Sequence, residues 1–143
     1  MKFKILFTII LFVFASLGSA DELMNAVDSK DRSEKNIVRD EFRKPYETLS
    51  FFQLEPDMTI VELSPGGGWY TEILANFIRK SGNLIAAHFS KDSDRAYFRN
   101  SRINFEKKVK ENSLYEKVRI VDLNSKLSDP SSVDAVLTFR NLH

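Results

Sequence analysis

The sequence predicts an α/β fold in which helices cover a parallel sheet, and three observations lead to this prediction. From residue 58 onwards, short apolar segments alternate with segments that have helical spacing. The apolar segments are nearly continuous, as at residues 83–87 and 134–137, which is typical of parallel strands buried on both faces. Three consecutive glycines separate the first apolar segment from the first helical one. This alternation implies right-handed crossovers between parallel strands.

Two short helices are expected before the alternating part. The first covers residues 33–44 with Ser33 as its N-cap. The second covers residues 46–54 after Pro45, whose ring ends or interrupts the first helix. The side chains expected to anchor these helices are Ile37, Val38, Phe42, Leu49, Phe51 and Phe52.

The alternating part is expected to contain four strands and two helices. The strands are expected at residues 59–63, 84–89, 118–123 and 133–139. The helices are expected at residues 69–80 and 93–111. Gly82 follows the first of these helices, at a place where a left-handed residue is favoured. A polar loop at residues 124–132 precedes the last strand.

Composition and charge limit the classes of function. The chain has 143 residues, enough for one domain, and its 43% hydrophobic content suits a packed core. Removal of residues 1–20 takes away two lysines and no acid, which changes the net charge from +1 to −1. This nearly neutral balance gives no electrostatic reason to expect nucleic acid. Two histidines and no cysteine disfavour a zinc site and exclude disulfides. Lys107, Lys108 and Lys110 are interpreted as a solvated helix face.

The first twenty residues have the pattern of a secretory signal peptide. Lys2 and Lys4 precede an apolar run that ends in small residues before Asp21. The alternative is an uncleaved membrane anchor, but the apolar run is shorter than the roughly 20 residues that a span needs, and no stable span is expected after cleavage. Residues 21–32 are polar and are predicted to be a mobile arm. The α/β domain is therefore expected at residues 33–143.

The glycine-rich turn, residues 64–68, is the candidate binding site. A strand, a glycine turn and a helix in this order bring backbone amides close to a small polar ligand. One alternative is a tight turn that binds nothing. Another is a nicotinamide dinucleotide, but its pattern requires a third glycine where Thr71 stands.

Several segments together carry a resemblance to a known family. They are RKPYETL at residues 43–49, ELSPGGG at 62–68, the strand at 82–88, Asp122, and DAVLTFRNLH at 134–143. In these segments the chain resembles class I S-adenosylmethionine-dependent methyltransferases, and more closely a bacterial group of predicted methyltransferases that carry export signals. The resemblance covers residues 33–143 and implies a Rossmann-like parallel sheet with flanking helices. Together with the signal peptide it implies export to the periplasm.

The resemblance also implies roles for individual residues. Gly66 and Gly68 would let the backbone lie against the methionine part of S-adenosylmethionine, and Glu62 would organise its amino group. His88 takes the ribose position, where an acid is usual, and Ser64 replaces a glycine, which a negative φ would allow. The complete set of expected cofactor residues is Glu62, Ser64, Pro65, Gly66, Gly67, Gly68, His88, Asp122 and Arg140. No catalytic residue and no metal ligand is predicted.

The resemblance leaves two functions open. The family's fold has seven strands, and the chain ends after the fourth, so an exposed strand edge and self-association through it are expected. The first function is an exported methyltransferase that acts on an unknown small molecule or envelope component. The alternative is a truncated or degenerate methyltransferase fold that binds without catalysis, which His88 and the missing strands favour.

Overall fold

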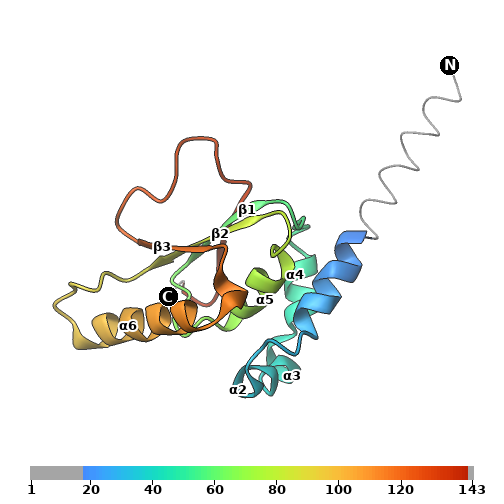
Figure 1. The fold of residues 1–143 in the computed structure, drawn as a ribbon, viewed down its shortest axis with the longest axis horizontal. Coiled ribbons are helices and arrows are strands. Elements are labelled where there is room, and N and C mark those ends of the chain that lie inside the picture. Colours follow the sequence, from blue (N-terminus) through green and yellow to red (C-terminus); the bar gives the residue numbers. More distant parts are fainter. Residues whose placement is uncertain (1–17, 142–143) are drawn as a thin grey trace, which may run out of the picture.

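The computed structural model describes residues 18–141 (Figure 1). Most of the predicted signal peptide therefore lies outside the described residues. A helix over residues 18–27 comes first. The elements that follow are α2 (Glu34–Ile37), α3 (Asp40–Arg43), α4 (Pro45–Ser50), β1 (Thr59–Leu63), α5 (Trp69–Phe77), β2 (Asn83–His88), α6 (Ala96–Glu111), η1 (Ser113–Tyr115), β3 (Val118–Asp122) and β4 (Ala135–Thr138). Within this part of the chain, no helix is long and apolar enough to cross a membrane.

The four strands form one parallel sheet in the order β3-β2-β1-β4. This Rossmann-like α/β arrangement confirms the predicted sheet with flanking helices. Strand β1 pairs with β2 on one side and with β4 on the other, so the chain reverses its direction of travel across the sheet beside β1. Ligands of open parallel sheets bind at the carboxyl end of the strands at such a reversal. The glycine loop leaves β1 at this point.

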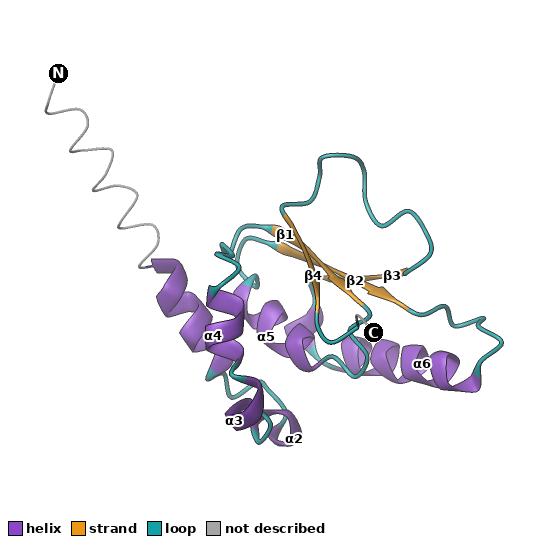
Figure 2. Cartoon of the chain, turned by 180° about the vertical axis from the view of Figure 1, so that it is seen from behind, coloured by secondary structure: helices purple, strands orange, loops and turns teal. Residues whose placement is uncertain are grey.

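The two faces of the sheet are covered differently. Helices α5 and α6 lie on one face, and the loop between β3 and β4 arches over the other (Figures 1 and 2). The helical side holds the larger core, to which Ile60, Leu84 and Leu137 contribute from the strands. On the other face Val61, Ile85 and Ala87 are buried beneath loop residues that include Leu123, Leu127 and Val133.

The prediction that the strands are buried on both faces is correct for the central strands only. Strands β1 and β2 are almost fully buried, as their apolar runs predict. Among the described strands, β3 and β4 form the edges, and Val136 of β4 is 60% exposed. The expected exposed edge is therefore present at β4.

The prediction that residues 21–32 form a mobile arm is wrong. The helix over residues 18–27 covers most of it, and Leu23, Ala26 and Val27 are buried in the main core. Their spacing of three and four residues forms one apolar stripe, which the many charged neighbours conceal in the sequence. Arg32, at the end of the segment, is buried and donates to both carboxylate oxygens of Asp40, at 2.6 and 2.9 Å.

The helix predicted for residues 33–44 is interrupted, and most of its expected anchors are exposed. It forms two separate turns, α2 and α3, and ends at Lys44 in a left-handed conformation. Phe42 and Phe51 are more than 80% exposed, whereas Leu49 is buried as predicted. Polar contacts hold the segment instead: Ser33 Oγ donates to Glu72 Oε1 at 2.8 Å rather than capping α2.

Gly82 is required for a reason other than the predicted one. Its φ lies outside the left-handed region, in which only Gly66 and Gly68 among the described glycines are found. A Cβ at this position would lie 2.6 Å from the carbonyl oxygen of Met58 and 2.7 Å from that of Pro56. Glycine thus allows the backbone before β2 to pass close to the backbone before β1.

Candidate functional site

The glycine loop follows β1 with three residues at positive φ. They are Ser64 at 53°, Gly66 at 59° and Gly68 at 76°. The condition under which serine could replace the glycine, a negative φ, is therefore not met at Ser64. The Ser64 amide donates to Ala87 O of β2 at 2.8 Å, which continues the ladder past the end of β1. This bond holds a serine in a conformation that glycine adopts more easily.

The three glycines have different surroundings. A Cβ added to Gly66 or Gly67 would meet no heavy atom within 4 Å, whereas one at Gly68 would lie 2.9 Å from the ring of Phe105. Gly68 therefore packs against α6, and Gly66 and Gly67 border open space. Neither the Gly66 nor the Gly67 amide donates to an acceptor in residues 18–141. These two residues form the cradle of the site.

His88 supports the loop from below. Its Nε2 lies 3.0 Å from Gly66 O, and the amide of Phe89 donates to Nδ1 at 2.8 Å. Since Nδ1 accepts a hydrogen bond, the proton is assigned to Nε2, which donates to Gly66 O. The ring is fully buried, and this burial lowers the pKa of His88. Both nitrogens are thus engaged within the protein, and a contact with ribose would require one of these bonds to break.

Glu62 is also buried beneath the loop. It is 2% exposed and accepts a hydrogen bond from Thr71 Oγ1 at 2.6 Å. Burial raises its pKa from 4.5 to about 7, against the opposing effects of Thr71 and the Lys108 charge. The carboxyl group thus fastens the end of β1 to the first turn of α5.

Lys108 contacts the glycine loop, which the sequence did not lead us to expect. Its Nζ donates to Glu72 Oε1 at 2.7 Å and to the carbonyl oxygens of Gly67 and Gly68 at 3.1 and 3.2 Å. Lys108 is therefore a support of the glycine loop and not only part of a solvated face. The sequence did contain one indication of this role. Lys108 follows Phe105 by three residues, and residues with this spacing lie on the same face of a helix.

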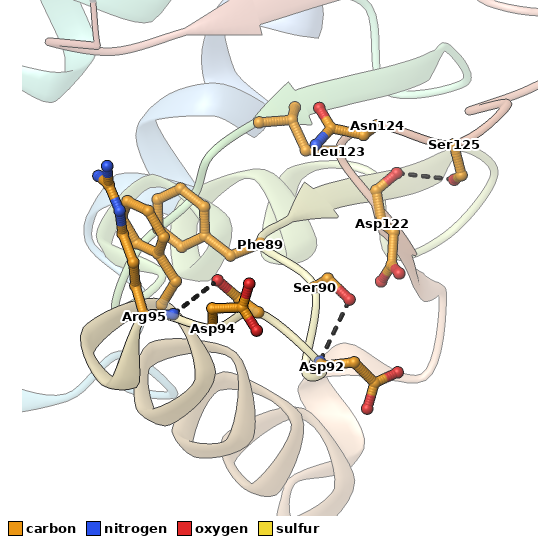
Figure 3. Close-up of a pocket in the computed structure, with 11 residues that line it drawn as sticks. Phe89, Ser90, Asp92, Asp94, Arg95, Asp122, Leu123, Asn124 and Ser125 are labelled. Atoms are coloured by element: carbon orange, nitrogen blue, oxygen red, sulfur yellow. Dashed lines mark hydrogen bonds between the residues drawn. The ribbon is translucent and has the colours of Figure 1, made fainter.

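A first cleft lies beyond the ends of β2 and β3 (Figure 3). Its volume is about 730 Å³. Ser90, Asp92 and Asp94 line it from the segment after β2, and Asp122 and Asn124 line it from the end of β3. The Asp122 carboxylate accepts a hydrogen bond from the buried Arg102 at 2.8 Å, which fixes one side of this cleft.

A second cleft, of about 530 Å³, borders the glycine loop. Ser64, Pro65, Gly66 and Gly67 line it together with residues that follow β4. Its basic lining residues are Lys35, Arg39, Arg43 and Arg140. Arg140 has a φ of 61°, and the neighbouring Asn141 donates to Leu63 O at 3.1 Å, which ties the segment after β4 to the end of β1.

The structure divides the predicted site residues into two groups. Those that line a cleft are Ser64, Pro65, Gly66, Gly67, Asp122 and Arg140. Those that support the loop from below are Glu62, Gly68 and His88. The basic residues Lys35, Arg39 and Arg43 were not predicted, because only the fold brings them to the glycine loop.

Comparison with known proteins adds no identification. No protein-family model and no curated protein sequence matches this chain. The site is therefore interpreted from its own geometry.

Proposed function

We propose that the glycine loop binds S-adenosylmethionine and that the chain is an exported methyltransferase-like protein. The observation that carries this proposal is the open cradle at Gly66 and Gly67, at the point of chain reversal and on the wall of the second cleft. A ligand with a nucleoside at one end and an amino acid at the other suits this arrangement, because the first cleft can hold the nucleoside and the open cradle can hold the amino acid.

The residues present fit such a ligand. The nucleoside end would lie in the first cleft, where Asp92, Asp94 and Asp122 offer acceptors for hydroxyl and amine groups. The methionine end would lie across Gly66 and Gly67, whose missing side chains allow close approach. When bound, the cofactor supplies an activated methyl group on a sulfonium. The chain's own residues would then mainly hold the two reactants in line and exclude water.

Two features disfavour a nicotinamide dinucleotide. Thr71 occupies the place of the third glycine, is fully buried, and bonds to Glu62. Trp69 and Tyr70 begin α5 with large buried rings. In a dinucleotide site the third glycine allows the helix to lie close to the strand, and these rings prevent that.

A non-catalytic binding module is the second candidate. One observation favours it: both ring nitrogens of His88 are engaged inside the protein, so neither is free for the cofactor. Such a module would bind the same ligand at the same site as the methyltransferase, but it would not transfer the methyl group.

A titration of the full chain with S-adenosylhomocysteine tests the site. Trp69 is the only tryptophan and lines the second cleft beside the loop, so its fluorescence reports on binding. A saturable change that NAD does not produce is expected. No change in a protein that unfolds cooperatively would contradict the proposal.

Gly67→Asp is the variant that tests the loop itself. Its side chain would enter open space, so the fold is expected to tolerate it, while the carboxylate blocks the cradle and repels the methionine carboxylate. Gly68→Asp is less informative, because the new side chain would collide with Phe105. Asn83→Asp, which is exposed at the opposite end of the sheet, is the matched control. Normal binding of S-adenosylhomocysteine by Gly67→Asp would refute the assigned loop.

An assay of methyl transfer to added acceptors distinguishes the two candidates. The enzyme would transfer the methyl group, and the binding module would not.

A further inference from the structure

The second cleft carries an unusual concentration of positive charge. Its lining residues include Lys35, Arg39, Arg43 and Arg140 and no carboxylate. Three of these come from the segment of α2 and α3, and the fourth follows β4, about a hundred residues later. Their meeting beside Gly66 is therefore a property of the fold.

Three arginines elsewhere in the described chain, Arg32, Arg79 and Arg102, each pair with a carboxylate, at 2.6, 3.1 and 2.8 Å. No side chain of the four cleft cations donates to an acceptor within residues 18–141. Burial and the like charges of Arg39 and Arg140 lower the pKa of Arg43. A cleft lined by one sign of charge concentrates ions of the opposite sign.

One of the arginines is held in place without an anion, and another has a strained backbone. The Arg43 guanidinium lies 4.8 Å from the centre of the Trp69 ring, and Trp69 Nε1 donates to Asn36 O at 2.7 Å. Arg140 adopts a φ of 61°, which is costly for a residue with a side chain. Strained backbone that its surroundings maintain is typical of binding sites.

We propose that this cleft binds an oxyanion, a carboxylate or a phosphate ester, which the acceptor of the proposed methyl transfer carries. The inference rests on the proposed function. Guanidinium groups suit both oxyanions because their planar donors form paired hydrogen bonds with them. The cofactor cannot supply the missing charge, since its single carboxylate is outweighed by its own ammonium and sulfonium groups. An acceptor anchored by Arg39, Arg43 and Arg140 would lie directly beside Gly66 and Gly67.

The test measures anion binding and cofactor binding separately in the full chain. Trp69 fluorescence is followed while pyrophosphate or citrate is added at constant ionic strength, with and without saturating S-adenosylhomocysteine. A saturable change with at least one anion is expected, and it should persist when S-adenosylhomocysteine is bound. Vesicles of phosphatidylglycerol, compared with phosphatidylcholine, distinguish a lipid headgroup from a free anion as the source of the oxyanion.

Single charge removals identify the residues. Arg39→Gln and Arg140→Gln are both at exposed positions, and each is expected to weaken anion binding about tenfold, the effect of one charge-assisted hydrogen bond. The affinity of Arg39→Gln for S-adenosylhomocysteine should stay within about threefold of that of the original chain. Arg119→Gln removes the same charge from the opposite edge strand, β3, and should leave anion binding unchanged.

The possible failures can be told apart. Binding of S-adenosylhomocysteine without binding of either anion or of phosphatidylglycerol would overturn this inference alone. Competition between anion and S-adenosylhomocysteine, or an equal loss of both in Arg39→Gln, would overturn it by assigning the arginines to the cofactor carboxylate. Anion binding without any S-adenosylhomocysteine binding would refute the proposed function and, with it, the role of the anion as an acceptor group.

Discussion

Replacement of Glu62 by glutamine should change how the stability of the protein depends on pH. Burial raises the pKa of Glu62 in the folded chain from 4.5 to about 7. Below pH 4.5 the carboxyl group is neutral in the folded and unfolded chains alike, and it costs the fold nothing. As the pH rises towards 7, the unfolded chain ionises first, and the free energy of unfolding falls.

The size of this effect follows from the two pKa values. Each pH unit between them removes about 1.4 kcal/mol, so the total loss by pH 8 is about 3 kcal/mol. Glu62→Gln cannot ionise and keeps an oxygen that can accept the hydrogen bond of Thr71 Oγ1. The variant should therefore match the original chain near pH 4.5 and exceed it by about 3 kcal/mol at pH 8.

Urea unfolding at pH 4.5, 6 and 8, followed by the emission of the buried Trp69, measures this difference. Glu72→Gln is the contrasting variant. Burial alone would raise the pKa of Glu72, but hydrogen bonds, above all from Lys108, outweigh it and lower the pKa. Glu72 thus stabilises the fold at neutral pH, and its glutamine variant should lose stability there and recover relative to the original chain as the pH falls. A difference between Glu62→Gln and the original chain that stays constant from pH 4.5 to 8 would refute the reasoning.

Three further predictions concern packing, the support of the loop and the sheet edge. Gly82→Ala should lower the free energy of unfolding by about 2 kcal/mol in urea, because its Cβ meets two backbone oxygens, whereas Gly67→Ala, which meets nothing, should change it far less. Lys108→Met should cost about 3 kcal/mol in the same assay, since it leaves the buried Glu72 without its cation, and a cost below about 0.5 kcal/mol would show that the contact is unimportant. The full chain should self-associate at high concentration through β4, and Val136→Lys should shift it towards monomer in sedimentation velocity; an unchanged distribution would exclude this edge as the interface.

The sequence alone was sufficient for the sheet and for the position of the loop. Strands β1 and β2 are mostly apolar because they are buried on both faces, and this requirement appears directly in their residues. The three glycines identified the turn because few other residues adopt the backbone conformation that Gly66 requires. These are local properties of the chain, and each can be read within about ten residues.

Only the tertiary structure decided the roles of residues that act across the fold. His88 supports the loop rather than facing a cleft, because its ring meets Gly66 O, which lies 22 residues earlier in the chain. Phe42 is exposed and Leu23 is buried, opposite to their apparent roles, because burial depends on which surface a helix finds to pack against. The positive charge of the second cleft arises because α3 and the segment after β4 meet beside Gly66. No local pattern in the sequence encodes this meeting.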